Sequence, residues 1–162
     1  MEKRDEYQVI KRRIESFLQD GGLDPAVLIE ELSTEKCRDL QYMFLVHHKF
    51  SFVVRLYESE VEGGIMANYL LAEVTFGNLP KLGESDALKY LLQWNRQEHT
   101  PIKAATYEDG LCILSCRVMA GGVDLHYLMS LLHRMIDLSQ GLHKALHQQD
   151  TTTDEVPGKL VM

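Results

Sequence analysis

Apolar side chains recur along the chain with two different spacings, which separate helical from extended segments. In residues 3–20 they are spaced as on one face of a helix, at Tyr7, Ile10, Ile14, Phe17 and Leu18. Gly21-Gly22 ends this helix, and Asp24-Pro25 supplies the N-cap and first residue of a second helix, predicted over residues 25–32. From about residue 41 the spacing changes to two, which predicts strands.

Three strands follow, separated by short turns. The first covers Tyr42–His48 and is joined to the second through a tight connection near Lys49. The second alternates apolar and polar positions from Phe50 to Tyr57, as in a strand that is covered on one face. The third runs from about Met66 to Phe76 and ends at Gly77-Asn78-Leu79-Pro80.

A helix comes next, and its pattern indicates which side faces the core. We expect Ser85 to cap it, Leu88, Leu91 and Leu92 to point inward, and the helix to end before Pro101.

A hairpin and a long helix complete the pattern. Residues 102–108 and 111–119 flank Asp109-Gly110, where a tight type I′ turn with positive φ at both central positions is predicted. The last helix opens at Asp124 and ends near Gln148, with an apolar side formed by Leu125, Leu128, Leu132, Met135, Leu142 and Leu146.

The element order α-α-β-β-β-α-β-β-α predicts an α+β fold with an antiparallel, five-stranded sheet. No linker divides the chain, so we expect a single domain over residues 1–148. Residues 149–162 have no periodicity and contain Pro157 and Gly158, so they are predicted to form a disordered tail.

Composition narrows the classes of function. The 162 residues carry a formal net charge of −7 and are 45% hydrophobic, as expected for one globular domain. An acidic chain lacks the basic face that nucleic-acid binding requires, so we expect no nucleic-acid partner. The chain begins with no secretory signal pattern and contains no apolar run of about 18 residues, so we expect a cytoplasmic protein that does not enter a membrane.

Four of the seven histidines fall in the last predicted helix, at His126, His133, His143 and His147. They share one stripe, but the stripe is about 30 Å long, so only the last two could share an ion. A catalytic zinc site needs at least three protein ligands. We therefore interpret the stripe as a solvated helix face and predict no metal site.

The cysteines offer little support for catalysis. Cys112 and Cys116 share a strand face about 13 Å apart, beyond disulfide reach, and are predicted to be core thiols. A nucleophilic cysteine would need a neighbouring histidine, and only His47, His48 and His99 lie outside the last helix.

The acidic residues and the sequence motifs likewise offer little support for catalysis. Glu58, Glu60 and Glu62 continue the strand alternation beyond the apolar face, which indicates a solvated hairpin end rather than a calcium site. The chain contains no phosphate-binding loop and no hydrolase motif. We therefore predict no catalytic residues and no cofactor, and keep a small metal-dependent or thiol enzyme as the alternative.

The predicted strands carry apolar side chains on both faces. Val53 and Tyr57 in the second strand and Tyr69 and Leu71 in the third lie opposite the row that faces the core. Such a face is covered either by another chain or by the protein's own first two helices. We take these four residues as candidate partner-binding positions, with a second copy of the chain as the first candidate partner.

The order of elements resembles the type III secretion chaperone fold, and the second half of the chain resembles the YbjN family. The segments that carry this resemblance are Leu91–Arg96 (LLQWNR), Tyr107–Gly110 (YEDG) and Gly121–Asp124 (GGVD). Phe52–Tyr57 (FVVRLY) and Ala72–Pro80 (AEVTFGNLP) resemble the uncharacterised cyanobacterial and plastid branch of this group. The resemblance covers about residues 40–147.

This resemblance implies a homodimeric, non-enzymatic module that binds or regulates other proteins. Secretion chaperones bind extended client segments by combining strand addition with apolar pockets. The helical segment near residues 25–32 is an addition to the chaperone pattern, so it bears on whether a client surface is free in this chain.

Overall fold

Six strands form one antiparallel sheet in the computed structural model, which describes residues 5–80 and 83–151. Their order across the sheet is β1-β2-β3-β4-β6-β5. The strands are β1 (Ile29–Glu31), β2 (Asp39–Val46), β3 (Phe50–Val61), β4 (Ile65–Asn78), β5 (Lys103–Thr106) and β6 (Leu111–Met119). The helices of the described residues are α1 (Glu6–Asp20), α2 (Pro25–Leu28), α3 (Glu84–Gln97) and α4 (Leu125–Thr151). The predicted α+β class and antiparallel sheet are confirmed, with six strands instead of five.

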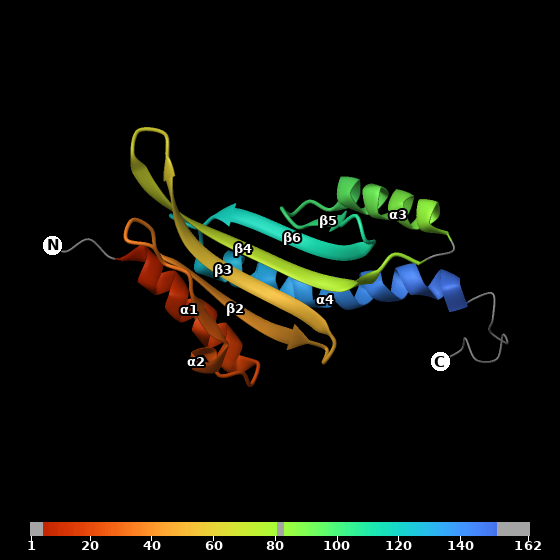
Figure 1. Ribbon diagram of the computed structural model, residues 1–162, viewed down its shortest axis with the longest axis horizontal. Coiled ribbons are helices and arrows are strands. Elements are labelled where there is room, and N and C mark those ends of the chain that lie inside the picture. Colours follow the sequence, from red (N-terminus) through yellow and green to blue (C-terminus); the bar gives the residue numbers. More distant parts are fainter. Residues whose placement is uncertain (1–4, 81–82, 152–162) are drawn as a thin grey trace.

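One face of the sheet carries the core, and α1 and α4 pack on it. Every second residue of the central strands turns to this side and is buried, as the alternation predicts. The hydroxyl of Tyr7 in α1 donates to the carbonyl oxygen of Leu56 (3.2 Å), and the Tyr42 hydroxyl donates to Glu15 of α1 (2.9 Å). These bonds hold α1 on the core face, and Figure 1 shows α4 crossing behind the strands.

The second helix is shorter than predicted, and this accounts for the sixth strand. Asp24 caps α2 as expected, but the helix ends at Leu28. Residues 29–31 instead form β1, which pairs with residues 40–42 of β2. A helix this short is unstable by itself, whereas an open strand edge offers backbone hydrogen bonds, so the tertiary pairing prevails.

The turns of two hairpins, between β5 and β6 and between β2 and β3, differ from the prediction. The β5–β6 hairpin is confirmed, but only Gly110 has a positive φ (86°), and the turn is closed by a bond from Gly110 N to the Tyr107 carbonyl (2.9 Å). The predicted two-residue type I′ turn there is wrong. Two consecutive positive φ values occur instead at His47 (53°) and His48 (59°), which join β2 to β3. The first strand therefore ends at Val46 and excludes both histidines.

α3 packs against β5 at the far edge of the sheet (Figure 1). Its N-cap is Gly83, with a φ of 81°, so the predicted Ser85 cap is wrong. Leu91 is buried as predicted, whereas Leu88 is 36% exposed and Leu92 is 65% exposed. A helix that packs on a four-residue edge strand buries a narrower stripe than one that packs on the middle of a sheet.

Polar contacts fasten the end of α3 to the rest of the fold. The side chain of Asn95 bonds both the N–H (2.7 Å) and the carbonyl (2.9 Å) of Ala104 in β5. Glu98 accepts two hydrogen bonds from Arg134 of α4, at 2.6 and 2.9 Å. These bonds join the end of α3 both to the neighbouring β5 and to α4, which is distant in sequence.

α4 continues to Thr151, beyond the predicted end near Gln148. The rest of the predicted tail, residues 152–162, lies outside the described residues. The division into a domain over residues 1–148 and a tail stays a prediction. Among the described residues, no helix is long and apolar enough to cross a membrane.

Candidate functional site

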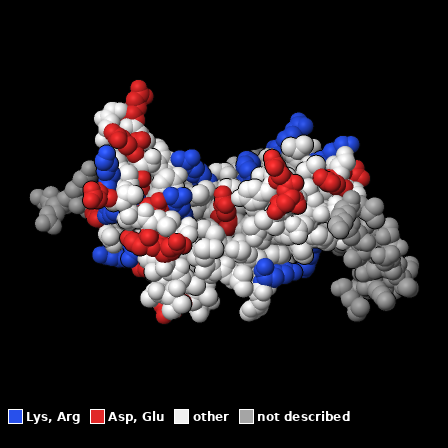
Figure 2. All heavy atoms as spheres, viewed as in Figure 1, with Lys and Arg blue, Asp and Glu red and all other residues white. Residues whose placement is uncertain are grey.

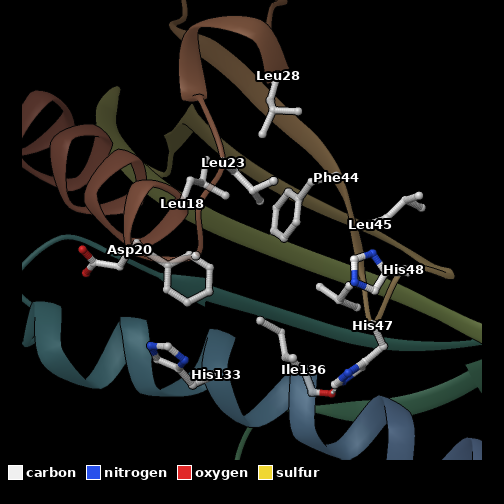
Figure 3. A pocket seen from close by; sticks show the side chains of 13 residues that line it. Leu18, Asp20, Leu23, Leu28, Phe44, Leu45, His47, His48, His133 and Ile136 are labelled. Atoms are coloured by element: carbon white, nitrogen blue, oxygen red, sulfur yellow. Dashed lines mark hydrogen bonds between the residues drawn. The ribbon is translucent and has the colours of Figure 1, made fainter.

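An apolar groove lies where the end of β2 meets α1, α2 and α4 (Figure 3). Its cavity volume is about 720 Å³, which is ample for several side chains of another chain. We call it the α1–β2 groove. Its walls include Phe17, Leu18, Leu23, Leu28, Phe44 and Ile136, and three histidines, His47, His48 and His133, also line it.

β2 has a free edge beside this groove. Leu32 N donates to the Asp39 carbonyl oxygen (2.8 Å), so the backbone groups of Asp39 point to the β1 side of β2. Alternate strand residues point the same way, which directs the N–H and C=O groups of Met43 and Leu45 to that side as well. β1 pairs no further than Tyr42, so these groups have no strand partner in the part of the chain that the structure describes. Such an edge is a template for an added strand.

The turn at the end of β2 is strained and tied to α4. A positive φ costs an ordinary residue about 1–2 kcal/mol, and His47 and His48 both adopt it. The Nε2–H of His47 donates to the carbonyl oxygen of Ile136 (3.0 Å), as Figure 3 shows. This bond holds one end of the α1–β2 groove in place.

The four candidate partner-binding residues lie together on the sheet face opposite the core. Tyr57 pairs with Tyr69 across β3 and β4, and their rings stack with centroids 5.5 Å apart. Leu71 and Val53 lie further along the same face, and all four are partly exposed. Because α1 packs on the core face, it does not cover them. We call Val53, Tyr57, Tyr69 and Leu71 the open sheet face.

Arginines contact the tyrosines of the open sheet face. Arg117 lies over both rings, with its guanidinium carbon 5.8 Å from the Tyr57 centroid and 5.0 Å from the Tyr69 centroid. Arg55 lies 4.9 Å from Tyr57 and forms an ion pair with Asp39. Cations over aromatic faces are attracted to them, so this surface combines apolar area with guanidinium groups, of which that of Arg55 is neutralised by Asp39.

The predicted carboxylate row lies where the β3–β4 hairpin projects from the sheet. Figure 2 shows acidic side chains gathered over this hairpin, and Glu60 and Glu62 are exposed. Glu58 accepts a bond from Arg38 (3.0 Å), which also bonds Asp5 (2.8 Å), and the Arg38 bond lowers the pKa of Glu58. Glu58 thus fastens the start of α1, and its side chain is only 15% exposed, so the predicted solvated hairpin end holds for Glu60 and Glu62 but not for Glu58.

The histidines of α4 differ from the predicted solvated stripe. His126 and His133 are exposed, but His143 and His147 are half-buried against β4, with ring centroids 4.4 Å apart. The Nδ1–H of His143 donates to the carbonyl oxygen of Phe76 (2.7 Å), and burial lowers the pKa of His143. Within the described ranges, no group of three or more His, Cys, Asp or Glu side chains is placed to hold a metal ion.

The two cysteines of β6 are core thiols, as predicted. Cys112 and Cys116 are buried, and burial raises the pKa of each to about 11. A thiol with this pKa stays protonated at neutral pH and is a poor nucleophile. Their environment therefore does not favour the alternative of a thiol enzyme.

Sequence reasoning missed the groove and the free edge of β2. Met43 is 48% exposed and Leu45 is 61% exposed, although both are apolar. The signal was present in the unbroken apolar run Tyr42–Val46, because such a run puts apolar side chains on both faces of a strand. Its place at the sheet edge is a property of the tertiary structure.

One family model matches much of the chain. The model of the Tir chaperone protein (CesT) family matches residues 61–143, from the end of β3 into α4. No curated protein matches the chain.

Solved structures share the fold at low sequence identity. A chain of the ExsC–ExsE complex is 16% identical, with a TM-score of 0.55, and the match covers 88% of this chain and 97% of that one. A chain of the HopA1–SchA chaperone–effector complex is 12% identical, with a TM-score of 0.53 and coverage of 88% and 99%. YbjN, a putative transcription regulator from E. coli, is 13% identical, with a TM-score of 0.43 and coverage of 84% and 90%. The ExsC–ExsE and HopA1–SchA matches confirm the predicted secretion chaperone-like fold, and the cyanobacterial and plastid branch stays a prediction.

Proposed function

Because the chain belongs to the Tir chaperone protein (CesT) family, we propose that it is a cytoplasmic, non-enzymatic chaperone-like protein that binds an extended segment of a client protein. The observation that carries this proposal is the α1–β2 groove beside the free edge of β2. One solved structure with this fold is a chaperone–effector complex, in which a protein client is bound.

The client binds by adding a strand to β2. The N–H and C=O groups of Met43 and Leu45 pair with the client backbone, which supplies affinity without regard to sequence. Every second client side chain then points into the groove, toward Phe17 and Phe44. The free edge spans residues 43–46, so it accepts about four residues of client, of which about two contribute apolar side chains to the groove.

The second surface of the proposal is the open sheet face, which we assign to a second copy of the chain. A two-fold dimer brings the same patch of both copies together, so stacked tyrosines from each copy meet. Aromatic and arginine side chains are enriched at such interfaces, and Tyr57, Tyr69 and Arg117 provide both types.

Capture from native cell extract tests the client site. The unmodified protein should retain a recurrent partner identified by mass spectrometry. Leu45→Lys and Met43→Lys should each weaken its retention at least about tenfold, because a charge on this strand edge opposes the addition of another strand. Tyr107→Lys, at an exposed position in the β5–β6 turn, is the control that should retain the partner. Equal retention by all three variants would contradict the proposed site.

Light scattering tests the open sheet face. The protein should have twice its chain mass of 18.6 kDa at high micromolar concentration. Tyr69→Glu should reduce the mass to that of one chain while the circular dichroism spectrum stays unchanged, and Tyr107→Glu should remain dimeric. A monomeric unmodified protein, or a dimeric Tyr69→Glu variant, would exclude this interface.

A further inference from the structure

One part of the β2 edge is occupied by a segment of the chain that is weakly anchored. This segment comprises α2 and β1, residues 25–31, and we call it the strap. Both strap elements are short, with four residues in α2 and three in β1. Pro25 is buried, but Val27 is 78% exposed and the β1 side chains are exposed or only partly buried. Segments with so few buried contacts open at a lower free energy than the core does.

The strap makes the same two kinds of contact that we assign to a client. Its β1 part pairs with residues 40–42 of β2, which is strand addition to the same edge. Its α2 part places Leu28 in the α1–β2 groove, beside Phe44. Ile29 pairs opposite Tyr42, so an extended continuation of β1 would lie opposite Met43, but α2 turns the chain away at that point.

We propose that the strap is an intramolecular occupant of the client site, and that a client displaces it. The proposal rests on the proposed function and adds a level of regulation to it. Displacement frees the β2 edge from Leu40 to Val46, so the client pairs with about seven residues instead of about four. The competing client segment is extended and aliphatic, because it replaces Leu28 and Ile29, which pack against the core.

The closed strap lowers the apparent affinity for a client. A client that binds only the open form has its dissociation constant divided by the fraction of molecules that are open. Removal of the strap should therefore tighten binding, and a covalent lock should abolish binding. If the groove binds clients while the strap stays in place, a covalent bond that holds the strap on β2 should have no effect on binding.

A disulfide between neighbouring strands provides the lock. Glu30 and Gln41 are cross-strand partners whose side chains already bond to each other (2.8 Å). Glu30→Cys with Gln41→Cys, in a Cys37→Ser background, should form the bond on oxidation, because paired strand residues lie within disulfide reach. Ser59→Cys with Ala67→Cys, partners in the β3–β4 hairpin, is the control lock away from the strap.

The probe is a fluorescent synthetic peptide with the sequence of residues 23–32, which contains the strap. A variant with Gly-Ser residues in place of residues 25–31 should bind this peptide at least about tenfold more tightly than the unmodified protein. The oxidised strap lock should not bind it, and reduction should restore binding to the level of the unmodified protein. The control lock should bind equally in both redox states.

The outcomes separate the two proposals. Equal binding by the oxidised and reduced strap lock would overturn the strap proposal alone. Failure of every form to bind, including the strap-replaced one, would overturn both the strap proposal and the β2 edge as a binding site. Hydrogen exchange gives a measurement that needs no client: the Glu30 amide should exchange much faster than that of Val54 in β3. Equal protection of the two amides would overturn the strap proposal.

Discussion

Replacing Glu98 with glutamine should destabilise the protein in a way that depends on pH. Glu98 follows α3, and its side chain is only 6% exposed. It accepts two hydrogen bonds from Arg134 and one from the Thr100 hydroxyl, so it joins the end of α3 to α4. Glutamine keeps the size of this side chain but removes its charge.

The expected loss of unfolding free energy follows from the pKa of the Glu98 carboxyl group. The hydrogen bonds from Arg134 lower the pKa of Glu98 from 4.5 to about 2. At about 1.4 kcal/mol per pKa unit this corresponds to about 3 kcal/mol. Arg134 is 48% exposed, so solvent screening reduces the expected loss in Glu98→Gln to about 1–2 kcal/mol.

The sign of the pH dependence is fixed by the lowered pKa. The folded-state pKa of Glu98 lies below its unfolded value, so the stabilisation is complete above about pH 4.5. It is lost as the pH falls from about 4.5 to about 2. The difference in unfolding free energy between the two proteins should therefore shrink by more than half between about pH 7 and about pH 3.

Urea unfolding followed by the fluorescence of Trp94, the single tryptophan, measures this difference. With an m-value of about 2 kcal/mol/M, the midpoint at neutral pH should fall by roughly 0.5–1 M in Glu98→Gln. Glu108→Gln, in the exposed β5–β6 turn, is the control and should leave the midpoint unchanged. A loss that is the same at neutral and acidic pH would refute the assignment of the stabilisation to the ionised pair.

Three further predictions concern packing, strain and reactivity. Gly77→Ala should lower the unfolding free energy by about 2–3 kcal/mol, because φ is 119° and a Cβ would lie 2.9 Å from His143 Nδ1; an unchanged urea midpoint would contradict this. His48→Gly should raise the unfolding free energy by about 0.5–1 kcal/mol by removing the strain of a φ of 59°, and a lower midpoint would show that the turn is not strained. Cys37 should react with a thiol reagent in the native protein, while the two buried cysteines of β6 should react only on unfolding; simultaneous reaction of all three would argue against their burial.

Periodicity was a reliable guide where each residue packs against the middle of the fold. It placed Tyr7, Ile10 and Ile14 on the buried side of α1, and it identified the core row of β3. It failed at the edges of the sheet, where the partner of a short segment decides its conformation. Residues 29–31 form a strand because β2 has an edge to pair with, and Leu92 is exposed because α3 packs only on a short strand.

The two candidate surfaces also differ in whether the sequence predicts them. The two-sided apolar pattern predicted that Val53, Tyr57, Tyr69 and Leu71 share one face, because alternation in a strand is a local property. The α1–β2 groove was not predictable, because it depends on where β1 stops along β2 and on how α2 and α4 approach that point. No local pattern encodes these distances.

The sequence alone therefore determined the class of fold, the core faces of its long elements, the buried thiols and the row of apolar residues on the second sheet face. These features follow from the spacing of apolar residues within single helices and strands, and burial of apolar area dominates their stability. Only the tertiary structure decided the order of strands, the strained turn at His47 and His48, and the unpaired edge at Met43 and Leu45. Each of these depends on backbone pairing between distant segments, which the periodicity of any one segment leaves open.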